Sequence, residues 1–221
     1  MKPRPRKHLS IALLAAPPLF LLVPAGVAGQ NPTATSADAI IVAGVEWTGH
    51  GNARAGLWHG DDALLIPSGG SARLDDAGFL DGALSFRLAT SGAPIVIGLE
   101  VRRTGDAERE VFYLRPHRSG TPGAVAFAPR ADHATAGSVS GTAFFAAEGW
   151  TDVRLELSGE RARLFVGPGA DPALEVADLL GGAAPGPIIL WAWPVTGSPP
   201  SPSGDEALAA LRDVELSRAE P

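Results

Sequence analysis

Cysteine is absent from this chain of 221 residues. The protein can therefore form no disulfide bond, and it has no thiolate that could act as a nucleophile or as a zinc ligand. A lipoprotein anchor is excluded as well, because that lipid is attached to a cysteine directly after the signal sequence. Whatever fold the chain adopts must be stabilised by its core, without covalent cross-links.

Lysine is nearly absent, since both lysines lie among the first seven residues, in a basic start of the chain. An apolar run follows at 9–22, and small residues end the segment at 25–28. This order is typical of a secretory signal peptide, and its prolines argue against a stable membrane-spanning helix. We therefore expect residues 1–28 to be a signal peptide and the protein to be secreted or periplasmic. After cleavage no membrane span would remain, although the segment could instead be retained as an anchor.

Positive charge is also scarce. The formal net charge of the whole chain is −6, and loss of residues 1–28 would change it to −10. Such a chain is poorly suited to bind nucleic acid or an anionic surface, so we expect neither as a partner. Apolar residues make up 45% of the chain, which excludes wholesale disorder.

No internal repeat and no second composition regime occurs, and short β-like segments follow one another about every ten residues, separated by turn residues. This pattern predicts an all-β, antiparallel sandwich or barrel. We expect a flexible lead-in at 29–39 and one domain at 40–218. The expected strands are Leu64–Ile66, Ser71–Leu74, Ala83–Ala89, Ile95–Arg103, Glu110–Arg115, Val125–Ala128, Ala143–Ala146, Thr151–Leu157, Ala162–Val166, Ile188–Trp193 and Arg212–Ser217.

Two local patterns are more specific. Apolar and charged residues alternate on both sides of a Ser-Gly-Glu-Arg turn over Val153–Val166, which predicts a hairpin with one buried face. Ser203 and Glu206 resemble a capping box, so we expect one helical turn at Ala207–Leu211 before the last strand. At most one or two short helices are expected in all.

Strand periodicity sorts side chains onto two faces. If the strands near positions 87, 100 and 113 are neighbours, their outward faces bring several polar residues together. These are Arg87, Glu100, Arg102, Tyr113, Arg115 and His117. Forked donors beside an aromatic ring suit a sugar or a carboxylated small molecule. The alternative is that outward Arg and Glu side chains, Glu100 and Arg102 above all, form cross-strand ion pairs.

The tryptophans allow two interpretations. Trp191 and Trp193 point the same way from one strand and could stack on sugar rings, but Ile189 shares their face and favours a place in the core. His50 and His59 lie near other tryptophans. Two histidines without a regular ligand spacing do not predict a metal site.

Catalytic motifs are not found. A retaining β-glucanase of the jelly-roll type carries Glu-x-Asp-x-x-Glu on one strand, whereas the nearest acidic groups here, Asp106–Glu110 and Glu156 with Glu160, have other spacings. Neither Gly-x-Ser-x-Gly nor His-Glu-x-x-His occurs. We therefore expect no catalytic residues, and we favour a non-catalytic protein while leaving enzymatic activity open.

The stretch Phe112-Tyr-Leu-Arg-Pro-His117, followed by Ser-Gly and Pro122, resembles a group of secreted bacterial proteins of the concanavalin A-like lectin/glucanase (laminin-G-like jelly-roll) superfamily. The resemblance extends over roughly 64–216 and implies a single antiparallel jelly-roll β-sandwich. Gly123 and Ala126-Phe127 stand where that group has polar and aromatic residues, so part of a ligand surface would be missing. The resemblance also implies that Ca²⁺ could be bound, although no acidic loop here has the dense ligand spacing of a calcium site.

Three functions remain open. The first is an exported, non-catalytic module that binds a carbohydrate or another surface ligand through Arg87, Glu100, Tyr113, Arg115 and His117. The second is a glycoside hydrolase or lyase with a divergent acid pair. The third is a structural or protein-interaction module without a small ligand. The oligomeric state is not predicted.

Overall fold

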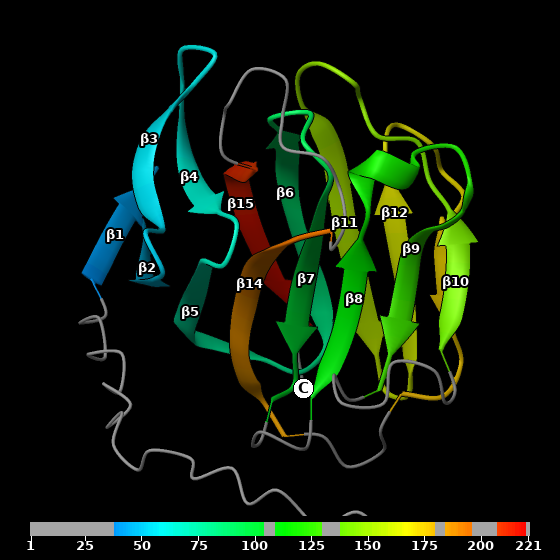
Figure 1. Ribbon diagram of the computed structural model, residues 1–221. Coiled ribbons are helices and arrows are strands. Elements are labelled where there is room, and N and C mark those ends of the chain that lie inside the picture. Colours follow the sequence, from blue (N-terminus) through cyan, green and yellow to red (C-terminus); the bar gives the residue numbers. More distant parts are fainter. Residues whose placement is uncertain (1–37, 104–108, 130–137, 180–183, 196–206, 220–221) are drawn as a thin grey trace, which may run out of the picture. The chain divides into compact units, whose positions relative to one another are not determined.

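The computed structural model describes residues 38–103, 109–129, 138–179, 184–195 and 207–219, and they form an antiparallel β-sandwich (Figure 1). The strands of this part of the chain are β1 (Asp38–Val42), β2 (Val45–His50), β3 (Arg54–Trp58), β4 (Asp61–Pro67), β5 (Ser71–Phe79), β6 (Gly82–Thr90), β7 (Ile95–Val101), β8 (Glu110–Leu114), β9 (Pro122–Ala128), β10 (Val139–Thr142), β11 (Thr151–Ser158), β12 (Arg161–Val166), β13 (Leu174–Val176), β14 (Gly186–Pro194) and β15 (Leu208–Arg218). A short 3-10 helix, η1 (Pro116–Arg118), follows β8.

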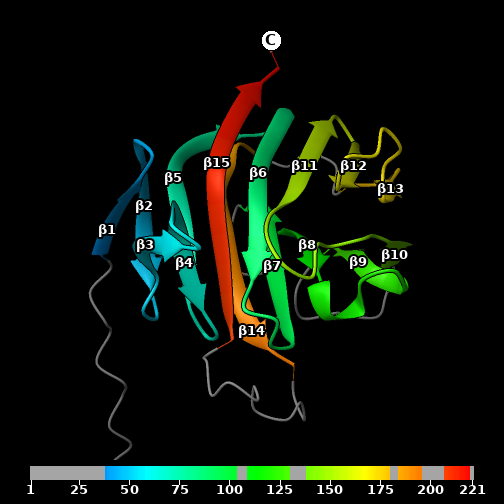
Figure 2. The same ribbon diagram turned by 90° about the horizontal axis from the view of Figure 1, so that it is seen from above.

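Two sheets lie face to face, and Figure 2 shows them as two layers. The eight-stranded sheet has the order β1-β2-β5-β14-β7-β8-β9-β10, and the seven-stranded sheet has the order β13-β12-β11-β6-β15-β4-β3. The chain changes sheets between β5 and β6 and again between β6 and β7. Consecutive strands are therefore often in different layers, as in a jelly roll.

The core follows the alternation that the sequence predicts. On β7 the inward residues are Ile95, Ile97, Leu99 and Val101, all fully buried. Phe112 on β8 packs against Phe127 on β9 with ring centroids 5.0 Å apart. Leu84, Phe86 and Leu88 face inward from the opposite sheet. Because successive side chains of a strand point to opposite faces, the residues that alternate with these core residues lie on the outer face of each sheet.

The predicted hairpin is confirmed. β11 and β12 pair with Val153 opposite Val166 and Leu155 opposite Leu164, and Gly159 in the turn has a φ of +58°. Ten of the eleven expected strands are present, most of them somewhat longer than expected.

Several expectations are corrected. Ala143–Ala146 is not a strand. The helical turn expected at Ala207–Leu211 is wrong, because β15 begins at Leu208 and pairs with β4 and β6. Pairing to strands on both sides outweighs the local helix signal, whose capping residues lie outside the described residues. The first three strands and the short β10 and β13 were not expected.

Most of the predictions for the N-terminal part of the chain concern residues outside the described ranges. Residues 1–28 lie outside the described residues, and so does most of the lead-in. β1 begins at Asp38, two residues before the expected start of the domain. In the part of the chain that the structure describes, no helix is long and apolar enough to cross a membrane.

Candidate functional site

Three aromatic rings form a row on the outer face of the eight-stranded sheet, the face turned away from the other sheet. Trp193 and Trp191 project from β14, and Tyr113 projects from β8, with β7 between them. The centroids of Trp191 and Trp193 are 6.1 Å apart, and those of Tyr113 and Trp191 are 5.8 Å apart, both pairs edge to face. We call Tyr113, Trp191 and Trp193 the aromatic row.

The core interpretation of the tryptophans is therefore wrong. Trp193 is 60% exposed and Trp191 is partly exposed, while Ile188, Leu190 and Ala192 face the core from the same strand. Ile189 shares the outer face with the tryptophans and is nevertheless buried. An apolar neighbour on the same face thus did not indicate which side of the sheet was the core.

Gly98 makes room for Trp191. The two residues lie opposite each other in the β7–β14 register, and a Cβ built on Gly98 would lie 2.0 Å from the indole of Trp191. The indole therefore lies directly over the backbone of β7. A residue with any side chain at position 98 would displace it.

Glu100 accepts a hydrogen bond from the same indole. Its Oε1 accepts a hydrogen bond of 2.9 Å from Trp191 Nε1, and Arg103 Nη1 lies 3.3 Å from its Oε2. Arg109 Nε is 3.9 Å from Oε1. Glu100 as a whole is 5% exposed. Glu100 is thus a buried, ion-paired group that orients Trp191. Its closer partner, Arg103, lies three residues along the chain, whereas the ion-pair alternative predicted a partner on an adjacent strand.

Arg115 extends the row beyond Tyr113. Its guanidinium lies over the Tyr113 ring at 5.4 Å from the centroid, and its Nη1 donates to the Gly123 carbonyl at 3.2 Å. Burial raises the pKa of the Tyr113 hydroxyl, and Arg115 partly opposes that rise. Burial, with the charge of Arg118 beside it, lowers the pKa of Arg115.

His117 lies at the end of the sheet. It is an exposed residue of η1, and its Nδ1 is 2.9 Å from the carbonyl oxygen of Ile95 at the start of β7. The contact ties η1 to β7. His117 therefore does not continue the outward face of β8, because the chain turns into η1 at Pro116, and proline suits the first turn of a helix.

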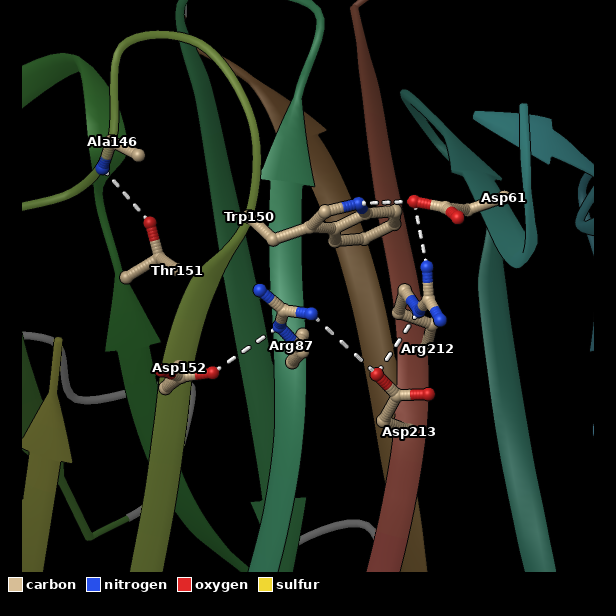
Figure 3. A network of polar contacts seen from close by, with 8 residues as sticks. All are labelled: Asp61, Arg87, Ala146, Trp150, Thr151, Asp152, Arg212 and Asp213. Carbon is tan, nitrogen blue, oxygen red and sulfur yellow. Dashed lines mark hydrogen bonds and ion pairs between the residues drawn. The ribbon is translucent and has the colours of Figure 1, made fainter. Parts of the chain in front are cut away.

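Arg87 does not belong to this face. β6 lies in the seven-stranded sheet, so Arg87 projects from the opposite outer surface, where it lies 3.3 Å from Asp152 and 3.9 Å from Asp213 (Figure 3). The prediction that it joins the other site residues assumed that consecutive strands are neighbours. Because the β6–β7 connection crosses between the sheets, that assumption fails.

Arg102 also leaves the outer face, for a different reason. Its φ is +50°, which ends the alternation of β7 at Val101. The buried guanidinium donates to the carbonyls of Leu80 and Gly159 and pairs with Asp81 at 2.8 Å. Since Gly159 lies in the turn between β11 and β12 of the seven-stranded sheet, Arg102 links the two sheets at one end of the sandwich.

The structure thus brings together Glu100, Tyr113 and Arg115 of the predicted residues, and adds Trp191, Trp193 and Gly98. The sequence showed that the two tryptophans share one face of their strand, but not that this face is the outer one or that Gly98 and Tyr113 lie beside it. A metal centre has no comparable support. In the described ranges no three His, Asp or Glu side chains lie together in a way that could hold an ion.

No protein-family model matches the chain, and no curated protein matches its sequence. Solved structures are similar to it. The β-glucanase of Bacillus licheniformis is 14% identical with a TM-score of 0.55, over 78% of this chain and 92% of that one. The carbohydrate binding module CBM66 from Bacillus subtilis is 11% identical with a TM-score of 0.51, over 79% and 96%. The Crh5 transglycosylase in complex with NAG is 13% identical with a TM-score of 0.56, over 79% and 80%.

The two antiparallel sheets and these likenesses define the fold of the protein. It is an antiparallel jelly-roll β-sandwich, the fold that the resemblance implied. At such identities the likeness establishes the fold, and both hydrolases and binding modules share that fold.

Proposed function

We propose that this protein is an exported module that binds a carbohydrate on the outer face of its eight-stranded sheet and does not catalyse a reaction. The observation that carries the proposal is the aromatic row. Its exposed indole at Trp193 offers an apolar surface on which a pyranose ring can stack, with the donors of Arg115 at the other end. Carbohydrate-related proteins among the structural neighbours support the same ligand class.

The distribution of carboxylates favours binding over catalysis. On the outward positions of β14, β7 and β8, all of which the structure describes, Glu100 is the one acidic side chain. It is buried and ion-paired. Glycoside hydrolysis ordinarily needs two carboxyl groups that flank the scissile bond, one of them free to give a proton. Glu100 instead fixes the position of Trp191.

A glycan array screened with purified residues 29–221, in calcium and in chelator, tests the proposal. We expect specific binding, and we expect Trp193→Ala to weaken it about tenfold because the stacking surface is lost. Leu57→Ala removes a similarly exposed apolar side chain from the other sheet and should leave binding unchanged. An array without bound glycans would overturn the proposal and favour a protein-interaction module.

The same preparation tests the enzyme alternative. We expect no turnover on a broad panel of polysaccharides. Hydrolysis or elimination that disappears in Glu100→Gln, while Trp193→Ala retains some activity, would show that the protein is an enzyme with a divergent acid group.

A further inference from the structure

Arginines elsewhere in the described chain are mostly neutralised by nearby carboxylates. The pairs are Arg73 with Asp75, Arg87 with Asp152, Arg102 with Asp81, Arg103 with Glu100, Arg154 and Arg163 with Glu156, and Arg212 with Asp61. In an acidic protein this is the expected arrangement, because a carboxylate is rarely far from a cation.

Arg115 and Arg118 are arranged differently. Among the described residues neither forms an ion pair with a carboxylate. Arg115 Nη1 donates to the Gly123 carbonyl at 3.2 Å, and a Cβ built on Gly123 would lie 3.3 Å from Arg118 Nη1. Both guanidinium groups therefore approach the same glycine, at the end of the aromatic row.

This proximity has an electrostatic cost. Arg115 is partly buried beside Tyr113, and the charge of Arg118 adds to the effect of burial in lowering the pKa of Arg115. An anion that binds beside both guanidinium groups would offset their mutual repulsion. Arg118 is exposed, so a ligand can reach the pair.

We infer that the ligand of this face is an acidic polysaccharide, whose carboxylate or sulfate group binds at Arg115 and Arg118 while a neighbouring sugar ring stacks on the aromatic row. The inference rests on the proposed carbohydrate-binding function and specifies its ligand class. Guanidinium groups donate in a planar fork that matches the oxygens of either anion. The net negative charge of the protein would repel such a polymer elsewhere, which restricts its binding to this region.

Matched pairs of oligosaccharides provide the test. One pair is oligogalacturonate and its methyl ester, and the other is a sulfated galactan oligosaccharide and its unsulfated counterpart. We expect the acidic member of at least one pair to bind roughly tenfold more tightly or better, and we expect its affinity to fall as NaCl is raised. Which pair shows the preference distinguishes a carboxylate from a sulfate ligand.

Two variants locate the anion. Arg115→Gln and Arg118→Gln should each weaken binding of the acidic oligosaccharide by about tenfold, and Arg118→Gln should change the affinity for its neutral partner by less than about twofold. Arg118 is exposed, so its variant keeps the test valid if Arg115→Gln disturbs Tyr113. Arg161→Gln removes the same charge from β12 in the other sheet and serves as the control.

The outcomes separate the two proposals. Equal affinity for acidic and neutral oligosaccharides, both dependent on Trp193, would overturn the acidic ligand and leave carbohydrate binding intact. Acidic preference that persists in both arginine variants would also overturn the inference. Binding that is unaffected by Trp193→Ala, or absent for every oligosaccharide, would contradict the proposed function itself.

Discussion

Gly98 determines the position of Trp191, because the indole occupies the space in which any other residue would carry its Cβ. The backbone conformation of Gly98 does not require glycine, since its φ is not in the left-handed region. The requirement is purely steric. It links a single residue of β7 to the proposed ligand surface on β14.

Gly98→Ala should therefore disturb the aromatic row without breaking the strand. We expect it to destabilise the protein by about 1–3 kcal/mol through overpacking, and to weaken glycan binding by displacing Trp191. Urea unfolding and tryptophan fluorescence measure both effects. Gly169→Ala is the matched control, because a Cβ at position 169 meets nothing within 4 Å. Unchanged binding and stability in Gly98→Ala would contradict this prediction, because they would show that the indole of Trp191 can shift away from a Cβ at position 98 at no cost.

Tyr113 is the one tyrosine of the chain, so its ionisation can be followed by absorbance alone. Burial beside Trp191 raises the pKa of its hydroxyl above the usual 10.0. A group whose pKa is raised by folding stabilises the folded state below its unfolded pKa and loses that contribution as the pH rises through the folded pKa. The stability of the wild type should thus fall above about pH 10 relative to that of Tyr113→Phe.

Spectrophotometric titration of the folded protein and of the protein in urea measures this difference directly. The folded midpoint is expected to be the higher of the two. A folded midpoint at or below the unfolded one would mean that Arg115, rather than burial, dominates the environment of Tyr113.

At the scale of elements, polar contacts on the outer face of a sheet also connect neighbouring strands. On the outer face of the seven-stranded sheet, Arg212 of β15 lies 2.6 Å from Asp61 of β4, and Trp150 Nε1 donates to the same carboxylate oxygen at 2.9 Å (Figure 3). Arg212 also lies over the Trp150 ring. These contacts connect β4, β15 and the segment that leads into β11.

This network predicts a pH dependence. Hydrogen bonds from Arg212 and from Trp150 lower the pKa of Asp61 below its usual 3.8. A carboxyl group whose pKa is lowered by folding stabilises the protein above the unfolded pKa, and it loses that contribution as the pH falls through the folded pKa. The stability advantage of the wild type over Asp61→Asn should therefore be present at pH 6 and should diminish below about pH 4.

Chemical unfolding of both proteins at several pH values measures that advantage. Asp62→Asn is the control, because Asp62 is the exposed neighbour that faces away from Arg212. An advantage of the wild type that does not change with pH would show that Asp61 acts through its shape and not through its charge.

For the whole molecule, the basic start and the apolar run within residues 1–28 carry a prediction about where the protein is located. We propose that residues 1–28 direct the chain out of the cytoplasm. In a bacterial host that expresses the full chain, we expect the extracytoplasmic fraction to contain a protein that begins at Gly29. Intact mass and N-terminal sequencing measure the processed end.

A charged residue within the apolar run provides the control for this experiment. Leu14→Arg should block export and leave the full-length chain in the cytoplasm. A wild-type chain that stays in the cytoplasm unprocessed would refute the export proposal, and an exported chain of full length would indicate a retained anchor.

The sequence by itself determined what depends on local periodicity. Alternation decided that Leu99 and Phe112 face the core while Glu100 and Tyr113 face outward, and the turn residues separated most strands and defined the β11–β12 hairpin. It also placed Arg115 beside Tyr113, because residues two apart on a strand share a face. These features need no knowledge of which strands are neighbours.

Only the tertiary structure decided which faces belong together. Arg87 and Glu100 are both outward residues on consecutive strands, yet the chain changes sheets between β6 and β7 and places them on opposite surfaces. Trp191 meets Tyr113 because β14 pairs with β7, a partner about 90 residues away in the chain. Pairing between such distant strands depends on the packing of the whole sandwich, so no local pattern could have revealed the aromatic row.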